Sequence, residues 1–170
     1  LTVIEDCAAG ICSSYHGRPL GTFGDMAMWS FDAMKILVCG DGAMLHFKDP
    51  EMKKKAEKYL YFGLTAKSGY ENSVADKWWA LEQYKKLPVY MEKRAHVHAY
   101  YDEHLRDLPW IDLPLPIPAE NTTSYYFYHI QITNGLRDQL AKYLRERGIY
   151  TTYRYFPLHR VPGYRVTEGS

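Results

Sequence analysis

Hydrophobic and polar positions in the first part of the chain follow the pattern of short strands joined by turns. Apolar runs predict strands at residues 1–5, 26–31 and 43–47, with a short polar strand and turn around residues 13–21. A helix is predicted over residues 50–61, because its apolar positions share one face and its lysines lie largely on the other. The apolar face holds Met52, Ala56, Tyr59 and Leu60, and the other face holds Lys53, Lys54, Lys55 and Lys58. This order of elements indicates a layered α/β domain.

The middle of the chain has a helical pattern instead. Residues 74–87 predict a helix that Pro88 stops, because proline lacks the backbone N–H that a helix interior needs. A second helix is predicted over residues 89–105. An extended connector follows, marked by Pro109, Pro114, Pro116 and Pro118.

The last part of the chain mixes strand and helix signals. Residues 124–132 alternate in a way that predicts a strand, and residues 135–147 predict a helix that Gly148 ends. Residues 149–159 predict a further strand and a loop. We therefore divide the chain into a first domain, residues 1–88, and a smaller α+β domain, residues 89–170.

Composition indicates a globular protein without a strong electrostatic field. Of the 170 residues, 46% are hydrophobic and 24% are charged, and 21 lysines and arginines face 20 acids for a net charge of +1. This balance argues against a nucleic-acid or anionic-membrane partner. No apolar run approaches the ~20 residues that a membrane-spanning helix needs. The three cysteines, an odd number in small or apolar settings, favour reduced thiols and a cytoplasmic location.

The most informative chemistry lies around Lys35. This lysine follows an apolar run and precedes a glycine turn, and an ammonium taken out of water must be paired, be neutralised or become a nucleophile. Ser30 lies five residues earlier, and Asp6 ends the preceding strand, where ligands of open α/β sheets bind. Pyridoxal phosphate (PLP) needs these three groups: an acid for its ring nitrogen, a hydroxyl for its phosphate and a lysine for a Schiff base.

The segment that carries these residues resembles a known family. "VIEDCAAGICSSYHGRPLGTFGDMAMWSFDAMKILVCGDGAML" is similar, without a gap, to the stretch of the DegT/DnrJ/EryC1/StrS sugar aminotransferases between their Glu-Asp-Ala-Ala-Gln and Gly-Glu-Gly-Gly segments. The resemblance implies a partial PLP-transferase fold type I large domain followed by a smaller α+β domain. It implies that Asp6 is the partner of the pyridine nitrogen, Ser30 a phosphate ligand, and Lys35 the Schiff-base lysine and proton carrier.

The chain departs from the family pattern at several positions. Ala9 stands where the family commonly has glutamine or histidine beside the cofactor ring. The segment that reaches the partner subunit's cofactor phosphate matches only at Asn72, which the resemblance implies as a cofactor ligand. The common histidine before Tyr-Pro is Arg154 here, so Arg154, Tyr155 and His159 are candidate substrate residues.

The resemblance implies transfer of an amino group from an amino-acid donor, glutamate by expectation, to a nucleotide-linked keto sugar. Two alternatives stay open: a non-catalytic or regulatory family member, and an aminotransferase for an aminocyclitol or another keto substrate. The resemblance implies a site that a second subunit completes, so we expect a homodimer of the full chain, and the aromatic residues Trp78, Trp79 and Tyr84 suit its interface. The chain opens inside a strand and is shorter than family members, so we expect a fragment that is inactive alone.

Overall fold

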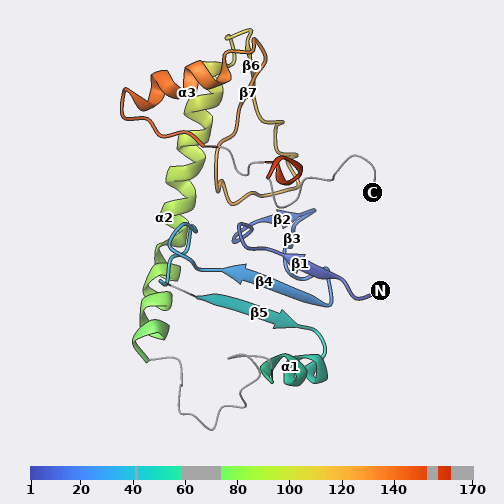
Figure 1. Ribbon diagram of the computed structural model, residues 1–170. Coiled ribbons are helices and arrows are strands. Elements are labelled where there is room, and N and C mark those ends of the chain that lie inside the picture. Colours follow the sequence, from blue (N-terminus) through green and yellow to red (C-terminus); the bar gives the residue numbers. More distant parts are fainter. Residues whose placement is uncertain (41, 59–73, 153–156, 162–170) are drawn as a thin grey trace. The chain divides into compact units, whose positions relative to one another are not determined.

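The fold is seen in a computed structural model, which describes residues 1–40, 42–58, 74–152 and 157–161 (Figure 1). The elements follow one another as β1 (Ile4–Asp6), β2 (Ser14–Tyr15), β3 (Arg18–Pro19), β4 (Met26–Ser30), β5 (Ala43–Phe47), α1 (Pro50–Glu57), α2 (Val74–Leu105), β6 (Ile111–Asp112), β7 (Gln131–Ile132), α3 (Arg137–Arg145) and the short 3-10 helix η2 (Leu158–Arg160).

The chain forms two compact units. The first consists of Leu1–Asp107 and Leu113–His129, and the second of Leu108–Asp112 and Ile130–Ser170. The division at residue 88 concerns the large and small domains of a whole protein, and it stays a prediction.

A three-stranded sheet in the order β1-β4-β5 organises the first unit (Figure 1). β1 runs parallel to β4, and β4 runs antiparallel to β5. The strands predicted at residues 1–5, 26–31 and 43–47 are confirmed, although β1 begins only at Ile4. The small antiparallel pair β2-β3 confirms the polar strand and turn expected near residues 13–21.

The parallel pairing of β1 and β4 fixes which residues meet at one edge of the sheet. Carboxyl ends of parallel strands lie at the same edge, so both strands deliver their last residues there. The register pairs Asp6 with Met28, and Ser30 lies two residues further along β4. Cys7 continues the alignment by donating its N–H to the carbonyl oxygen of Met28 at 2.9 Å. Two of the predicted site residues therefore lie on adjacent strand ends.

The core of the first unit lies between the loop after β4 and helix α2. Its buried members are Ile36 and Leu37 from the loop and Leu87 from α2. Partly buried side chains pack around this centre, namely Ile11, Phe31, Cys39, Met91 and Tyr126. The loop that carries Lys35 is therefore attached to the longest described helix through apolar burial.

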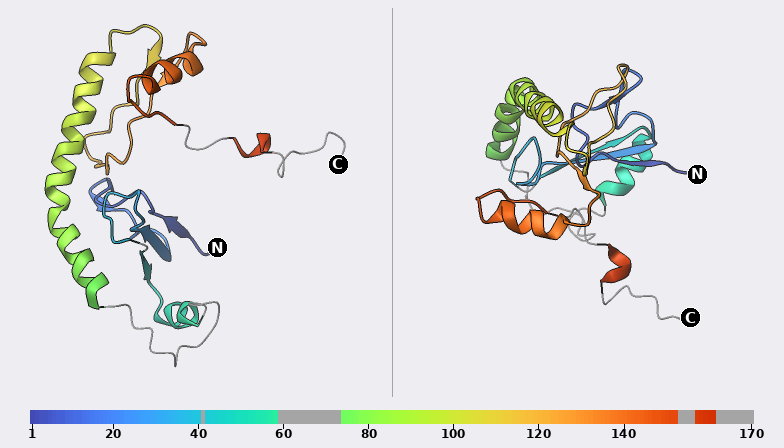
Figure 2. Two further views of the ribbon diagram at one scale, coloured as in Figure 1. Left: turned by 60° about the vertical axis from the view of Figure 1, so that its left-hand side comes forward. Right: turned by 90° about the horizontal axis from the view of Figure 1, so that it is seen from above.

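Helix α2 contradicts the prediction that Pro88 ends a helix. The helix runs from Val74 to Leu105 with Pro88 inside it, and Figure 2 shows it as one continuous, gently curved element. An interior proline removes one hydrogen bond and costs about 3 kcal/mol. Leu87 and Met91, on either side of the proline, both pack into the core and hold the two halves in line. Tertiary burial thus outweighs the local signal.

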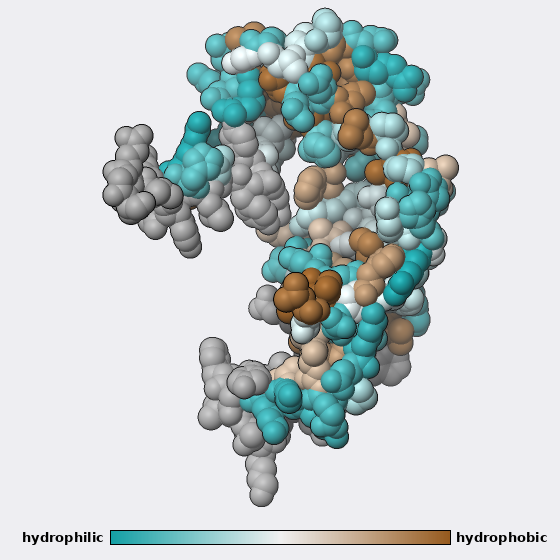
Figure 3. Space-filling model, turned by 90° about the vertical axis from the view of Figure 1, so that its right-hand side faces the viewer, coloured by the Kyte–Doolittle hydropathy of each residue, from teal (hydrophilic) through white to brown (hydrophobic). Residues whose placement is uncertain are grey.

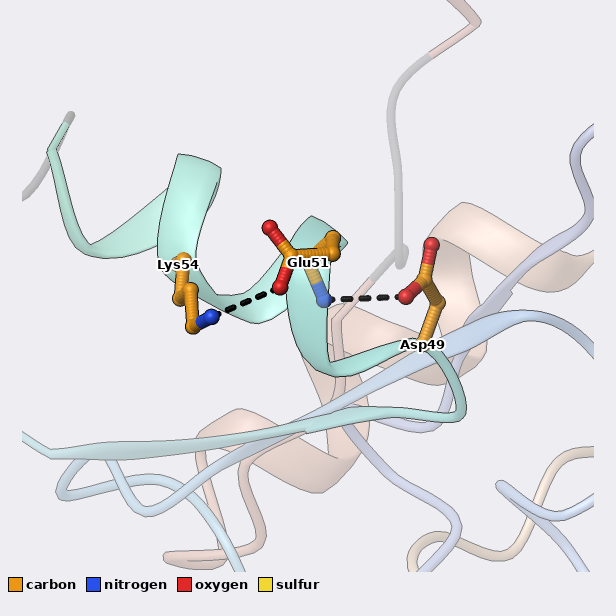
Figure 4. A network of polar contacts seen from close by, with 3 residues as sticks. All are labelled: Asp49, Glu51 and Lys54. Carbon is orange, nitrogen blue, oxygen red and sulfur yellow. Dashed lines mark hydrogen bonds and ion pairs between the residues drawn. The ribbon is translucent and has the colours of Figure 1, made fainter.

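Helix α1 begins as its sequence predicts and is stabilised locally at its first turn. Asp49 caps the helix, its Oδ1 accepting the N–H of Glu51 at 2.9 Å (Figure 4). Glu51 in turn accepts a hydrogen bond from Nζ of Lys54 at 2.6 Å through its Oε1. The helix closes at Glu57, and the last predicted positions, residues 59–61, lie outside the described residues.

The second unit contains the pair β6-β7 and helix α3. Ile111 is buried in the strand pair, opposite Ile132. Gly148 ends the α3 segment in a left-handed conformation, with φ of 78°, as predicted. Its N–H is donated to Arg145, and the N–H of Ile149 is donated to Leu144, which satisfies two carbonyls of the last turn.

Of the two strands predicted in the C-terminal half, the one over residues 124–132 is largely wrong. Of residues 124–132, only Gln131–Ile132 are a strand. Tyr125 has a left-handed backbone, with φ of 48°, and this turn breaks the extended run. Residues 149–152 are not a strand either, and residues 153–156 lie outside the described ones.

Large apolar side chains remain uncovered on the surface of the first unit. Ile4, Met44 and Leu45 are each about half exposed or more. Figure 3 shows hydrophobic side chains, in brown, among polar ones on one face.

None of the helices within the described residues combines the length and apolarity that crossing a membrane requires.

Two glycines with left-handed backbones offer a matched test of packing around β4. Gly21 has φ of 88° and Gly17 has φ of 73°. A Cβ added at Gly21 would overlap the ring of Trp29, whereas nothing lies within 4 Å of a Cβ added at Gly17. Gly17→Ala should lower the free energy of unfolding by about 1 kcal/mol, the backbone cost alone. Gly21→Ala should lower it by about 3 kcal/mol or more, because steric overlap adds to that cost.

Denaturant titration of the two variants of the full-length protein measures the difference. Equal losses for the two substitutions would mean that Trp29 does not pack against Gly21.

Candidate functional site

Lys35 lies in a loop whose two ends are fastened together. The loop joins β4 to β5, and at its base Phe31 donates its N–H to the carbonyl of Gly42 at 2.7 Å. Within the loop, Cys39 donates to the carbonyl of Phe31 and Lys35 donates to that of Asp32, both at 2.9 Å. These bonds account for the sharp path of the backbone around the lysine.

Apolar anchors next to Lys35 fix its position further. Ile36 is 5% exposed and Leu37 is 4% exposed, while Lys35 itself is half-buried. The backbone at Lys35 is therefore held by its neighbours' burial, and its amine stays at the margin of the core. There, Nζ lies 5.3 Å from the centroid of the Tyr126 ring, within the range of a cation–π contact.

Asp6 and Ser30 present oxygen atoms at the shared edge of β1 and β4. The Asp6 carboxylate is exposed, and its Oδ1 accepts the N–H of Ala8 at 3.0 Å. The Ser30 hydroxyl is half-buried, and its oxygen accepts a long hydrogen bond of 3.4 Å from the N–H of Asp32. A carboxylate, a hydroxyl and a lysine thus come from two strand ends and the loop that follows.

This donor set fits PLP in its chemistry. A carboxylate can face a pyridinium nitrogen, a hydroxyl can donate to a phosphate oxygen, and an amine can form an imine with an aldehyde. Asp6 and Ser30 lie at adjacent strand ends and Lys35 lies in the loop after Ser30, and their roles toward a cofactor stay predictions.

Glu5 performs a structural task that sequence reasoning missed. Its carboxylate accepts backbone N–H groups from Gly21 at 2.7 Å and from Phe23 and Gly24 at 2.6 Å each. Partial burial acts to raise the pKa of Glu5, but these three hydrogen bonds and the charge of Arg18 outweigh it and hold the pKa below its ordinary value. The acid beside Asp6 thereby orders the loop that leads into β4.

A distant segment, Glu120–Tyr126, lines the residues that follow Asp6. Ser14 and Thr122 exchange two backbone hydrogen bonds of 3.1 Å, and their hydroxyl oxygens lie 2.9 Å apart. Ser124, which is buried, donates its hydroxyl to the carbonyl of Ala9 at 2.6 Å. The backbone at Ala9 is thereby held from this segment. The sequence carries no local signal for this contact.

An aromatic cavity of about 580 Å³ lies along α2 in the same unit. In its wall, the hydroxyl of Tyr128 donates to Oδ1 of Asp102 at 2.7 Å. Burial raises the pKa of Tyr128 strongly, and the hydrogen bond to Asp102 raises it further. His98 lies edge-on to both Tyr125 and Tyr128, at 5.0 and 5.1 Å between ring centroids, and burial lowers its pKa. These groups form an aromatic wall with one hydrogen-bonded carboxylate.

The structure leaves the remaining predicted site residues untested. Asn72, Arg154 and Tyr155 lie outside the described residues. His159 lies in η2 of the second unit and is exposed. Their roles stay predictions.

Comparison with known proteins identifies the family of this chain. The family model described as DegT/DnrJ/EryC1/StrS aminotransferase family matches residues 1–170, the whole chain. The chain belongs to this family. A dTDP-4-dehydro-2,3,6-trideoxy-D-glucose 4-aminotransferase from Saccharopolyspora spinosa is 42% identical over 187 residues, which cover 98% of this chain and 49% of that protein.

Solved structures of DegT-family proteins share the fold. The aminotransferase TlmJ from Streptoalloteichus hindustanus is 39% identical, with a TM-score of 0.86, over 100% of this chain and 49% of that one. A family aminotransferase from Brucella abortus is 29% identical, with a TM-score of 0.78, over 96% of this chain and 45% of that one. These neighbours confirm the predicted family and fold class. The chain spans about half the length of the relatives it matches.

The three backbone hydrogen bonds that the Glu5 carboxylate accepts should make part of the protein's stability depend on pH. The pKa of Glu5 lies below its ordinary value of 4.5 in the folded state, so its contribution is complete above pH 4.5 and is lost as the pH falls through the lowered value. Glu5→Gln should lower the free energy of unfolding by about 1 kcal/mol at neutral pH, because a neutral amide cannot accept all three N–H groups.

Urea titrations of the full-length variant and wild type at several pH values test this prediction. The difference between the two proteins should narrow below pH 4.5. Glu146→Gln, at an exposed glutamate at the end of α3, is the control and should leave stability unchanged. A constant difference at all pH values would contradict a role for the Glu5 charge.

Proposed function

We propose that the protein to which this chain belongs is a PLP-dependent aminotransferase that moves an amino group from an amino-acid donor to a keto sugar. The observation that carries the proposal is the placement of Asp6 and Ser30 at adjacent strand ends, with the Lys35 loop directly after Ser30. Membership of an aminotransferase family and the similarity to a named sugar aminotransferase support it. PLP supplies the electron sink that stabilises a carbanion next to the amino group.

Each of the three residues has a distinct task in this proposal. Lys35 would hold PLP covalently through Nζ and, once released by the substrate, would carry a proton at the same atom. Asp6 would hold a proton on the pyridine nitrogen through its carboxylate. Ser30 would donate its hydroxyl hydrogen to a phosphate oxygen of the cofactor. Asn72 would contact the phosphate of the cofactor that is bound in the partner subunit.

The substrate is proposed to be a nucleotide-linked keto sugar, with glutamate as the donor. The similarity to the Saccharopolyspora spinosa enzyme, whose name specifies a dTDP-linked 4-keto sugar, supports this choice. Arg154, Tyr155 and His159 are proposed to contact the substrate. An aminocyclitol or another keto compound is the alternative substrate.

A regulatory, non-catalytic role is the second candidate function. Ala9, in place of the usual polar residue, favours it, whereas retention of Lys35 favours the enzyme.

We further propose a cytoplasmic homodimer. Tyr84, which is 62% exposed on α2, is a residue suited to an interface.

Replacing the lysine tests the chemistry most directly. Lys35→Ala in the full-length protein should abolish both the visible absorption band of lysine-bound PLP and transamination, because no other group at the site supplies the amine in this proposal. Lys53→Ala, at an exposed lysine on α1, is the matched control and should retain both. Absorption spectra and a coupled glutamate assay give the readouts. A Lys35→Ala protein that still shows the band would exclude Lys35 as the covalent ligand.

Replacing the carboxylate separates binding from catalysis. Asp6→Asn should still bind PLP, while kcat falls about 100-fold or more, because an amide cannot hold the ring nitrogen protonated. Asp138→Asn, at an exposed carboxylate on α3, is the control. PLP affinity is measured by absorbance titration and kcat in the same assay. Turnover near the wild-type rate in Asp6→Asn would remove Asp6 from the mechanism.

A further inference from the structure

The amine of Lys35 lies against the ring of Tyr126, a residue about which sequence reasoning offered only a strand assignment. The distance from Nζ to the ring centroid is 5.3 Å. Tyr126 is half-buried and packs against the core formed by Ile36, Leu37 and Leu87. The ring therefore touches both the apolar anchor of the Lys35 loop and the amine that the loop carries. An aromatic face attracts a charged ammonium group much more strongly than it attracts a neutral amine.

The backbone that delivers this ring adopts an uncommon conformation. Tyr125 has φ of 48°, a left-handed value that costs a residue with a Cβ about 1 kcal/mol. On one side of it, the buried Ser124 hydroxyl is tied to the carbonyl of Ala9 at 2.6 Å. The path of residues 124–126 is thus imposed by contacts and does not follow from local preference.

Arg94 of α2 holds the other side of this turn. Its Nη1 donates to the carbonyl oxygens of both Tyr125 and Tyr126, each at 2.9 Å. Both acceptors flank the peptide that orients the Tyr126 ring. Since the guanidinium is always charged, the two hydrogen bonds are charge-assisted and persist over the working pH range.

From this chain of contacts we infer that Tyr126 is a positioning residue for Lys35, and that Arg94 acts on the lysine through Tyr126. The ring attracts the ammonium form of Lys35 through the cation–π contact and limits where the amine can lie. The inference rests on the proposed function for its catalytic consequence. The contact itself is a property of the chain without cofactor, and it can be tested separately.

Competitive acetylation of the cofactor-free, full-length protein tests the contact. Acetic anhydride modifies only unprotonated amines, and mass spectrometry gives the labelling of Lys35 relative to that of exposed Lys53 in the same molecule. Tyr126→Leu should raise this ratio about two- to fivefold near neutral pH, the effect of losing one exposed cation–π contact. Tyr126→Phe keeps the ring and should match wild type.

Turnover by the same variants tests the catalytic consequence. Tyr126→Leu should lower kcat about tenfold or more, because the proton carrier loses its position, while Tyr126→Phe stays near wild type. The labelling ratio and kcat thus move in opposite directions. General damage to the fold by Tyr126→Leu would be seen as a lowered melting temperature of that variant relative to Tyr126→Phe. Tyr143→Leu removes a ring that covers Arg147 at 3.5 Å in the second unit, and this control should change neither labelling nor kcat.

A double-mutant cycle tests the role of Arg94. Arg94→Met should reproduce the labelling and kcat changes of Tyr126→Leu, and adding it to Tyr126→Leu should cause no further change. Arg94→Lys, which can still donate to a carbonyl, should recover part of the effect. Additive losses in the double variant would show that Arg94 acts independently of Tyr126 and would overturn its assigned role.

The labelling result also separates this inference from the proposed function. An unchanged Lys35 ratio in Tyr126→Leu overturns the inference, and so does a Tyr126→Phe protein that behaves like the leucine variant. Neither result affects the proposed aminotransferase, which depends on the loss of activity in Lys35→Ala. Conversely, an active Lys35→Ala enzyme would refute the function whatever the labelling shows.

Discussion

Burial of Ile36 and Leu37 against Leu87 is the contact on which the site depends. Each fully buried aliphatic side chain contributes about 1.5–3 kcal/mol relative to exposure. Those two residues come directly after Lys35, so the same burial that fixes the core also fixes the lysine's backbone. Because Leu87 precedes Pro88, the contact also lies at the position where α2 is locally weakest. The same apolar contact therefore forms the core, supports α2 at Pro88 and fixes the position of the Lys35 backbone.

Hydrogen bonds to the backbone complete what packing begins. The strand ends and loops around Asp6 expose N–H and C=O groups that β pairing does not reach, and buried or half-buried groups of this kind need partners. Glu5 accepts three N–H groups before β4, Ser124 donates to Ala9, and Arg94 donates to two carbonyls. In these three cases the polar side chain forms its hydrogen bonds with backbone groups.

Local pattern was enough to predict the elements whose partners are close in sequence. Strands β4 and β5, the start of α1 and the glycine that ends α3 follow from periodicity and capping residues, and the strand-end positions of Asp6 and Ser30 follow from the same pattern. Pro88 and residues 124–132 were misjudged, because burial of Leu87 and the turn at Tyr125 are imposed by distant contacts. For the same reason Arg94 and Tyr126 carried no local signal.

The hydrogen bond from Ser124 to Ala9 joins residues 115 positions apart, and this separation has a consequence for folding. Contacts between distant residues form late, because the chain must first close a long loop at an entropic cost. During synthesis, the Lys35 loop leaves the ribosome well before Tyr126 does. The lysine therefore meets its aromatic neighbour only after the segment that carries Tyr126 has been synthesised.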